Sequence, residues 1–185
     1  NNSFKFEELK PSTNKNLRAG QNIFESINGN DILLHHPFES FFPVVDFLAQ
    51  AANDPNVIAI KQTLYRTGPD SPIVDALIKA AQNGKEVTVA IELKARFDEQ
   101  DNIALAGRLQ DSGAIVVYGV VGHKTHAKMI LVVRREGKRL RRYVHVGTGN
   151  YHPVTSNLYT DFGLLTCSPT IGNDVQRMFQ QITSP

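Results

Sequence analysis

The sequence lacks most features that would place a protein in a membrane or in an oxidising compartment. It contains one cysteine, Cys167, so no internal disulfide can form and a reducing compartment is expected. Cys167 lies in an apolar run and is expected to be a buried small hydrophobe. No apolar run approaches the roughly 18 residues of a membrane-spanning helix, and the polar start, NNSFKFEELK, lacks the apolar segment of a signal peptide.

A strong net charge is also absent. The sequence has 20 Lys and Arg residues against 18 Asp and Glu residues, which gives a formal net charge of +2. Bulk electrostatics therefore does not indicate a nucleic acid partner, and any anion must be held by a local basic cluster. The 185 residues, 41% of them hydrophobic, are the size of one domain with a substantial core. The missing initiator Met and the ending QQITSP indicate a piece of a longer protein.

The chain divides into a lead-in and one α/β domain. Residues 1–29 are polar, contain Pro and Gly and show no clear period, which is typical of a linker. Residues 30–185 alternate between β-branched runs and helical patterns, which predicts a mixed, largely parallel sheet flanked by helices. The expected strands are 31–36, 56–65, 85–93, 114–119, 126–135, 142–150 and 161–168, and the expected helices are 40–54, 71–84, 98–113 and 169–182. A hairpin around REGKR makes the sheet mixed.

The stretch VVGHKTHAKMILVV concentrates basic side chains where a strand begins. Residues i and i+2 of a strand face the same way, so His126 and Lys128 project side by side. A nucleophilic imidazole beside a fixed positive charge suits attack on a phosphorus whose oxygens need neutralising. The later GTGN segment lets the backbone approach a ligand at its glycines, and Asn150 can orient an imidazole by accepting its N–H.

Two arginines are expected at the same edge of the sheet. Arg66 and Arg96 come just after consecutive predicted parallel strands. Ligands of such sheets bind outside the carboxyl ends of the strands, and Arg is the planar, permanently charged fork for phosphate oxygens. The alternative is local pairing of Arg66 with Asp70 and of Arg96 with Asp98.

These motifs carry two resemblances. HxK followed by G-[ST]-x-N resembles the half-motif of the phospholipase-D superfamily, although KMILVVRRE lacks the Asp that usually follows the Lys. The wider set, AIKQTLYRTGPDSPIVDALIKAAQNGKEVTVAIELKARFDE, HAK, HVGTGN and LYTDFGLLT, resembles polyphosphate kinase of the ATP-dependent, phosphohistidine type. The resemblance runs from Asp31 to the C-terminus and matches the first of that family's two C-terminal phospholipase-D-like domains.

The resemblance implies an activity and roles for several residues. His126 would be the histidine that ATP phosphorylates, Arg66 and Arg96 would belong to the phosphate and magnesium site, and Tyr159 would lie against the nucleotide. The implied reaction is reversible transfer of the γ-phosphate of ATP to polyphosphate, with Mg²⁺ as cofactor. The implied partners are ATP or ADP, polyphosphate, the remaining domains of the parent enzyme and further copies of it, but no nucleic acid. A cytoplasmic location is expected, with peripheral membrane association as an alternative.

Several alternatives stay open at this point. The domain could be a phosphodiesterase or nuclease of the same fold, or a non-catalytic lobe that binds polyphosphate. Lys124 could help to guide a polyanion, but His123 and Lys124 are equally well explained as solvated loop residues. His145 is expected to be a structural histidine. His152 is ambiguous. The run RREGKRLRR is most simply a solvated hairpin tip, and a surface that contacts polyphosphate is the minority interpretation.

Overall fold

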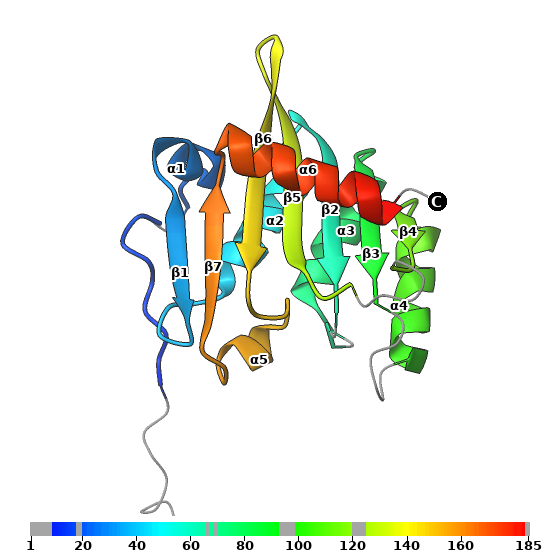
Figure 1. Ribbon diagram of the computed structural model, residues 1–185, viewed down its shortest axis with the longest axis horizontal. Helices are drawn as coiled ribbons and strands as arrows, with labels where there is room; N and C mark the ends of the chain where they lie inside the picture. Colours follow the sequence, from blue (N-terminus) through cyan, green and yellow to red (C-terminus); the bar gives the residue numbers. More distant parts are fainter. Residues whose placement is uncertain are drawn as a thin grey trace, which may run out of the picture.

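A computed structural model of the chain describes residues 9–17, 20–65, 67–68, 70–92, 99–119 and 125–183. Within these residues, seven strands form one sheet in the order β1-β7-β6-β5-β2-β3-β4 (Figure 1). The strands are β1 Ile32–His36, β2 Val57–Leu64, β3 Glu86–Ile91, β4 Ile115–Val117, β5 Lys128–Glu136, β6 Arg139–Gly147 and β7 Asp161–Thr166. The helices are α1 Ile23–Gly29, α2 Phe42–Asn53, α3 Pro72–Gln82, α4 Glu99–Asp111, α5 Pro153–Ser156 and α6 Pro169–Thr183.

The sheet is mixed, as the sequence predicts, but its parallel part is smaller than expected. Strands β2, β3 and β4 are parallel neighbours, joined by the crossover helices α3 and α4. All other neighbours are antiparallel: β1 with β7, β7 with β6, β6 with β5, and β5 with β2. The difference arises because β5 and β6 form a hairpin in the middle of the sheet, and β7 returns beside that hairpin.

Helices cover both faces of the sheet. Helix α6 crosses one face, and α2 and α3 lie on the opposite face (Figure 1). The larger core lies on the α2 and α3 side and includes Phe47 of α2 and Leu77 of α3. The smaller core lies under α6, where Phe179 meets Leu131 of β5. None of the helices within the described ranges is long and apolar enough to cross a membrane.

The helical periodicity identifies the buried face of α3 correctly and that of α4 in part. Ile73 and Leu77 of α3 are fully buried, as their spacing predicts. In α4 the sequence predicts that Ile103, Ala106 and Leu109 face inward, but Ile103 is 59% exposed. The spacing of three and four residues is instead satisfied by Leu105 with Leu109, so the buried stripe is rotated away from Ile103.

Packed structure begins earlier than the predicted start of the domain at residue 30. Helix α1 lies within the segment expected to be a linker, and Asn22 caps its N-terminus by accepting the backbone N–H of Phe24. The ring of Phe24 is buried and contacts the rings of Phe47 and Tyr143 at centroid distances of 5.8 and 4.9 Å. The helix therefore adds to the larger core, a role that the short apolar pattern IFESI does not reveal.

One edge of the sheet gathers the strand ends that the sequence analysis singles out. The carboxyl ends of β2 and β3 lie level, with Leu64 opposite Ile91. The first residue of β5, Lys128, pairs with the last residue of β6, Gly147. Helix α5 lies at the same end of the molecule, and the turn of the β5–β6 hairpin lies at the opposite end (Figure 1).

Candidate active site

The entry into β5 is fixed by a threonine of the neighbouring strand. The hydroxyl of Thr63 donates to the carbonyl of Ala127 at 2.7 Å and accepts the N–H of Met129 at 3.0 Å. Thr63 is buried, so both bonds are shielded from water. The backbone on both sides of Lys128 is therefore held to β2, which fixes the direction in which His126 and Lys128 project.

His126 and Lys128 are in direct contact, in the arrangement expected from their i and i+2 spacing. The Lys128 Nζ lies 3.0 Å from each ring nitrogen of His126 and donates to the His126 carbonyl at 2.8 Å. The Tyr65 ring stands edge-on to the imidazole, with the centroids 5.2 Å apart. His126 is exposed, whereas Lys128 is only 6% exposed. The pair thus presents an accessible imidazole with a sequestered ammonium beside it.

Two opposing effects act on the pKa of Lys128. Burial lowers the pKa of the Lys128 ammonium, because the charged form loses its hydration. The nearby Asp161 carboxylate acts in the opposite direction by favouring the charged form. Asp161 therefore helps to keep a cation beside His126.

The turn after β6 is fixed against the start of β7. The Thr148 hydroxyl donates to Asp161 Oδ1 at 2.7 Å and accepts the N–H of Phe162 at 3.0 Å. Gly149 is required here for steric reasons, because a Cβ at this position would lie 2.6 Å from Asp161 Oδ2. The close contact between Gly149 and Asp161 brings the next residue, Asn150, to the same cavity as His126.

One cavity is lined both by the start of β5 and by the segment that follows β6. Its volume is about 830 Å³, and His126, Lys128, Asn150 and Tyr159 all line it. Tyr159 is 62% exposed and lies at the rim, where its ring is accessible to a ligand. The other lining residues include both polar and apolar side chains: Thr67, Gly68, Asn102, Ala104, Leu105, Arg108, Thr148, Gly149, His152, Thr155, Leu158 and Asp161. Four residues separated by up to 33 positions in the sequence therefore share one site.

Arg66 and Arg96 lie outside the described residues, as do His123 and Lys124. The strands that precede the two arginines end level with each other in a parallel pair. Thr67 and Gly68, which directly follow Arg66, line the cavity. The roles of both arginines stay predictions.

His145 is a buried residue of β6 and is not among the described residues that line this cavity. It is 3% exposed, and its Nδ1 is 2.9 Å from the Tyr151 hydroxyl. Burial lowers the pKa of the imidazole from 6.5 to about 3, and the neighbouring His36 adds to this effect. A Cβ on Gly163 would lie 2.6 Å from His145 Nε2, so the glycine makes room for the ring. His145 is thus neutral and connects β6 to Tyr151, the residue after Asn150.

Asp161 and Thr148 are the site residues that the sequence analysis misses. Both lie within quoted motifs, since Thr148 belongs to GTGN and Asp161 to LYTDFG. The motif spacing did not indicate that they bond to each other, because β7 reaches β6 only through antiparallel pairing after α5. The structure shows two contributions of His152, whose role the sequence leaves ambiguous. Its ring accepts the Thr155 N–H at 3.4 Å at the start of α5, and it also lines the cavity.

Comparison with solved structures first defines the class of fold. The chain superposes on Nuc from Salmonella typhimurium, a phospholipase D family member, with a TM-score of 0.63 over 83% of this chain and 93% of that one. The sequences are 16% identical, so the likeness shows the fold, which is phospholipase-D-like. The α/β class predicted from the sequence is confirmed.

The chain belongs to the family described as polyphosphate kinase C-terminal domain 1, whose model matches residues 22–185. A polyphosphate kinase of Xylella fastidiosa (strain 9a5c) is 60% identical over 178 residues, which are 95% of this chain and 26% of that protein. One from Burkholderia lata is 60% identical over 97% of this chain and 27% of its own length. The crystal structure of polyphosphate kinase from Porphyromonas gingivalis matches with a TM-score of 0.85 and 37% identity, over 98% of this chain and 30% of that chain. The chain thus spans about a quarter of the curated relatives it matches.

Proposed function

We propose that the chain is the domain of a polyphosphate kinase that carries the phosphorylated histidine. In this proposal His126 takes the γ-phosphoryl group of ATP and passes it to the end of a polyphosphate chain, and the reaction runs in both directions. The observation that carries the proposal is the contact between the exposed His126 imidazole and the buried Lys128 ammonium in a cavity of about 830 Å³. Family membership is independent support.

The chemistry follows from the positions of the two side chains. A ring nitrogen of His126 attacks the γ-phosphorus, the bond to the β-phosphate oxygen breaks, and ADP leaves. Lys128 would neutralise the negative charge that develops on the phosphoryl oxygens, and its bond to the His126 carbonyl already holds it beside the imidazole. The Lys128 side chain therefore needs no rearrangement when the phosphoryl group is transferred.

Asn150 is our candidate for orienting the imidazole, on analogy with the phospholipase-D superfamily. Its Oδ1 is buried and has no hydrogen-bond partner within the part of the chain that the structure describes. A buried acceptor without a partner costs about 1–3 kcal/mol, so an N–H that enters the cavity would satisfy it. An imidazole N–H held in this way leaves the other ring nitrogen free to attack.

Mg²⁺ fits the chemistry of the cavity. Mg²⁺ is commonly bound by one or two carboxylates together with substrate phosphates, rather than by a cage of protein ligands. Asp161 is the carboxylate among the described lining residues, and no group of three or more metal-ligating side chains occurs within the described ranges. We propose that Asp161 and the substrate phosphates hold the ion, which neutralises phosphate charge. Arg66 and Arg96 would bind the substrate phosphates at this magnesium site, and the Tyr159 ring would lie against the base of the nucleotide.

Mass spectrometry of the full-length protein after incubation with ATP and Mg²⁺ tests the proposal. We expect one phosphate on His126, and we expect His126→Ala to lack both the phosphate and polyphosphate synthesis. Phosphate on another residue would show that the wrong nucleophile was chosen. Turnover of a phosphodiester without use of ATP would favour the phosphodiesterase alternative, and polyphosphate binding with neither reaction would favour a non-catalytic lobe.

A further inference from the structure

The β5–β6 hairpin extends beyond the rest of the sheet. Pairing of β5 with β2 stops at Arg134, and pairing of β6 with β7 begins only at Val144. Between Arg135, whose N–H still donates to the Asn56 carbonyl at 2.8 Å, and Val144, the two strands therefore pair within the sheet only with each other. Figure 1 shows this part of the hairpin standing clear of the neighbouring strands, at the end opposite α5. Apart from Tyr143 at its base, whose ring is buried against Phe24, a two-stranded ribbon of this kind buries little apolar surface, so other contacts must fix its direction.

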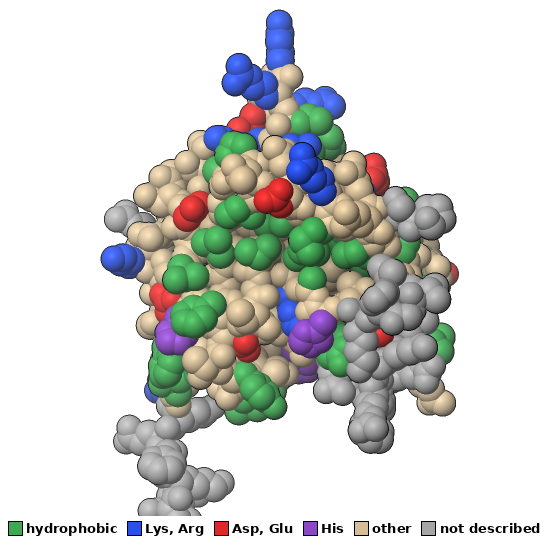
Figure 2. Space-filling model, viewed as in Figure 1, with side chains coloured by type: hydrophobic (Ala, Val, Ile, Leu, Met, Phe, Trp, Pro, Cys, Tyr) green, Lys and Arg blue, Asp and Glu red, His purple; other side chains and the backbone are tan. Residues whose placement is uncertain are grey.

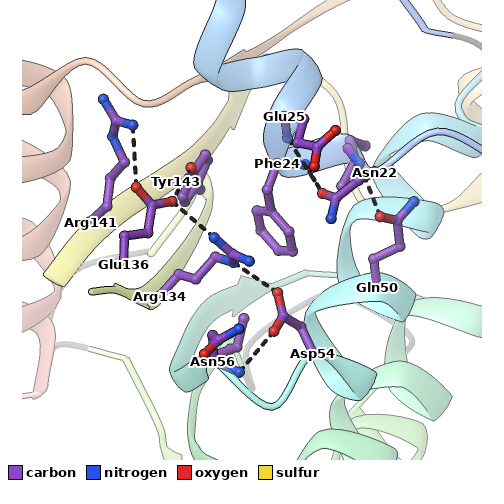
Figure 3. A network of polar contacts seen from close by, with 12 residues as sticks. Asn22, Phe24, Glu25, Gln50, Asp54, Asn56, Arg134, Glu136, Arg141 and Tyr143 are labelled. Carbon is purple, nitrogen blue, oxygen red and sulfur yellow. Dashed lines mark hydrogen bonds and ion pairs between the residues drawn. The ribbon is translucent and has the colours of Figure 1, made fainter. Parts of the chain in front are cut away.

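An ion-pair network at the base of the hairpin is joined to the body of the domain through Asp54 (Figure 3). Arg134 donates through Nε to Asp54 at 2.8 Å and through a terminal nitrogen to Glu136 at 3.1 Å. Tyr143 and Arg141 also donate to Glu136. Burial alone would raise the pKa of Glu136, but the bonds from Tyr143 and Arg134 outweigh it and lower the pKa below its usual 4.5. The hairpin is therefore held in one direction, and a ligand at its tip would bind a preordered surface.

The hairpin also carries basic side chains, beside and beyond this network, that form no ion pair within the described part of the chain. Arg135, Lys138 and Arg139 are exposed, and none of them forms an ion pair with any acidic residue in the described part of the chain. Glu136 is the one acidic residue between positions 134 and 142, and it is engaged by the base network. Figure 2 shows Lys and Arg side chains gathered on the projecting tip. Three like charges on one narrow tip repel each other, and an anion of high charge density would remove that repulsion.

We propose that Arg135, Lys138 and Arg139 form a second binding site for the polyphosphate chain, remote from the site of phosphoryl transfer. The proposal rests on the function proposed above. Strand β5 has nine residues from Lys128 to Glu136, so the tip lies about 30 Å from His126 at 3.2–3.4 Å per residue. A long polyphosphate can bind at both places at once, whereas a short one cannot. Binding at the tip then raises the effective concentration of the chain at the catalytic cavity.

This arrangement predicts a dependence on chain length that the cavity alone would not give. Long chains should have the lower KM, because they gain the additional contacts at the tip. By analogy with single-stranded nucleic acids, loss of three phosphate contacts should reduce the slope of log KM against log salt concentration by about 2. The rate of phosphoryl transfer should be unaffected, because none of the three side chains lies near His126.

The test uses the full-length protein and measures ATP formation from ADP with long-chain polyphosphate and with short oligophosphates. The Arg135→Ala, Lys138→Ala, Arg139→Ala triple variant should raise KM for long chains about tenfold, with kcat and the KM for short chains unchanged. A second variant, in which Arg135 and Arg139 of the native protein are replaced by Lys, keeps the charge of the tip. Its KM for long chains should equal that of the native protein. The matched control replaces three exposed lysines elsewhere, Lys10, Lys15 and Lys79, by Ala.

The outcomes separate this proposal from the proposed function. Equal effects of the triple variant and the control, or equal effects on long and short chains, would overturn the second site. So would a triple variant that loses binding of duplex DNA or of another protein but keeps native polyphosphate kinetics. If the native protein makes no ATP or polyphosphate at all, the proposed function fails. In that case, direct binding of labelled long-chain polyphosphate to the native protein, the triple variant and the control still tests the second site. Weaker binding by the triple variant alone would support it, and equal binding by all three proteins would overturn it.

Discussion

The buried His145 should make the stability of the domain depend on pH. The folded chain holds the pKa of His145 at about 3, against 6.5 when the imidazole is in water. Between these values the unfolded chain binds a proton that the folded chain does not, so the free energy of unfolding falls as the pH falls. His145 therefore contributes stability that is fully present above pH 6.5 and is lost as the pH falls towards 3.

The size of the effect follows from the same two values. Each pH unit within this window is worth about 1.4 kcal/mol, so acidification from pH 6.5 to pH 5 should remove about 2 kcal/mol. The acidic pairs do not interfere in this range. Asp54 and Glu136 have pKa values below 3.8 and 4.5, because hydrogen bonds from their partners outweigh the effect of burial, so they stay charged above pH 5.

Urea unfolding of the 185-residue chain at several pH values between 5 and 7.5 measures the effect. His145→Gln is the control, because its amide can still form a hydrogen bond with the Tyr151 hydroxyl but does not titrate. The variant will be less stable at every pH, so the prediction concerns the pH dependence alone. The free energy of unfolding of the native chain minus that of the variant should fall by about 2 kcal/mol towards pH 5. A constant difference would show that His145 takes up its proton while folded, which would refute the reasoning from burial. A His145 Cε1–H resonance that shifts over this range in the folded chain would refute it independently.

Three further predictions concern the site. His123→Ala in the full-length protein should reduce activity far less than His126→Ala, and equal losses in a radiolabelled phosphoenzyme assay would mean that both histidines act together. Arg66→Ala and Arg96→Ala should raise the KM for ATP without unfolding the domain, whereas a large drop in melting temperature with normal kinetics in the folded fraction would show a structural role. The isolated chain should fold yet make little or no polyphosphate from ATP and Mg²⁺, because phosphoryl transfer depends on the full set of positioned charges; synthesis near the full-length rate would contradict this.

The sequence predicts local geometry well where one element determines it. The contact between His126 and Lys128 follows from the alternation of side chains along an extended chain, and the structure places the Lys128 Nζ 3.0 Å from the ring nitrogens. The level ends of β2 and β3 follow from the parallel crossover through α3. In both cases the relevant residues are close in sequence or joined by one regular unit, so periodicity is sufficient.

Long-range antiparallel pairing is less predictable. The order β1-β7-β6-β5-β2 places the last strand between the first strand and the hairpin, and no local pattern specifies that insertion. The exposed Ile103 shows a similar limit on a helix, because the buried stripe of α4 is set by which side meets the neighbouring α3 and β4 rather than by its apolar residues alone.

The pairing of β6 with β7 explains why the sequence does not predict Asp161 as a site residue, although Asp161 lies within the motif LYTDFGLLT. An acidic residue beside a phosphate site is unfavourable on charge alone, so a search for phosphate-binding residues favours the arginines and the lysine. The structure gives Asp161 three simultaneous tasks: it accepts the Thr148 hydroxyl, it excludes any side chain at Gly149, and it opposes the effect of burial on Lys128. Each task requires β7 beside β6, and each bears on the geometry or charge around His126. The Asp that the phospholipase-D half-motif places after the Lys is missing from KMILVVRRE, and a carboxylate from a different strand stands near the same ammonium.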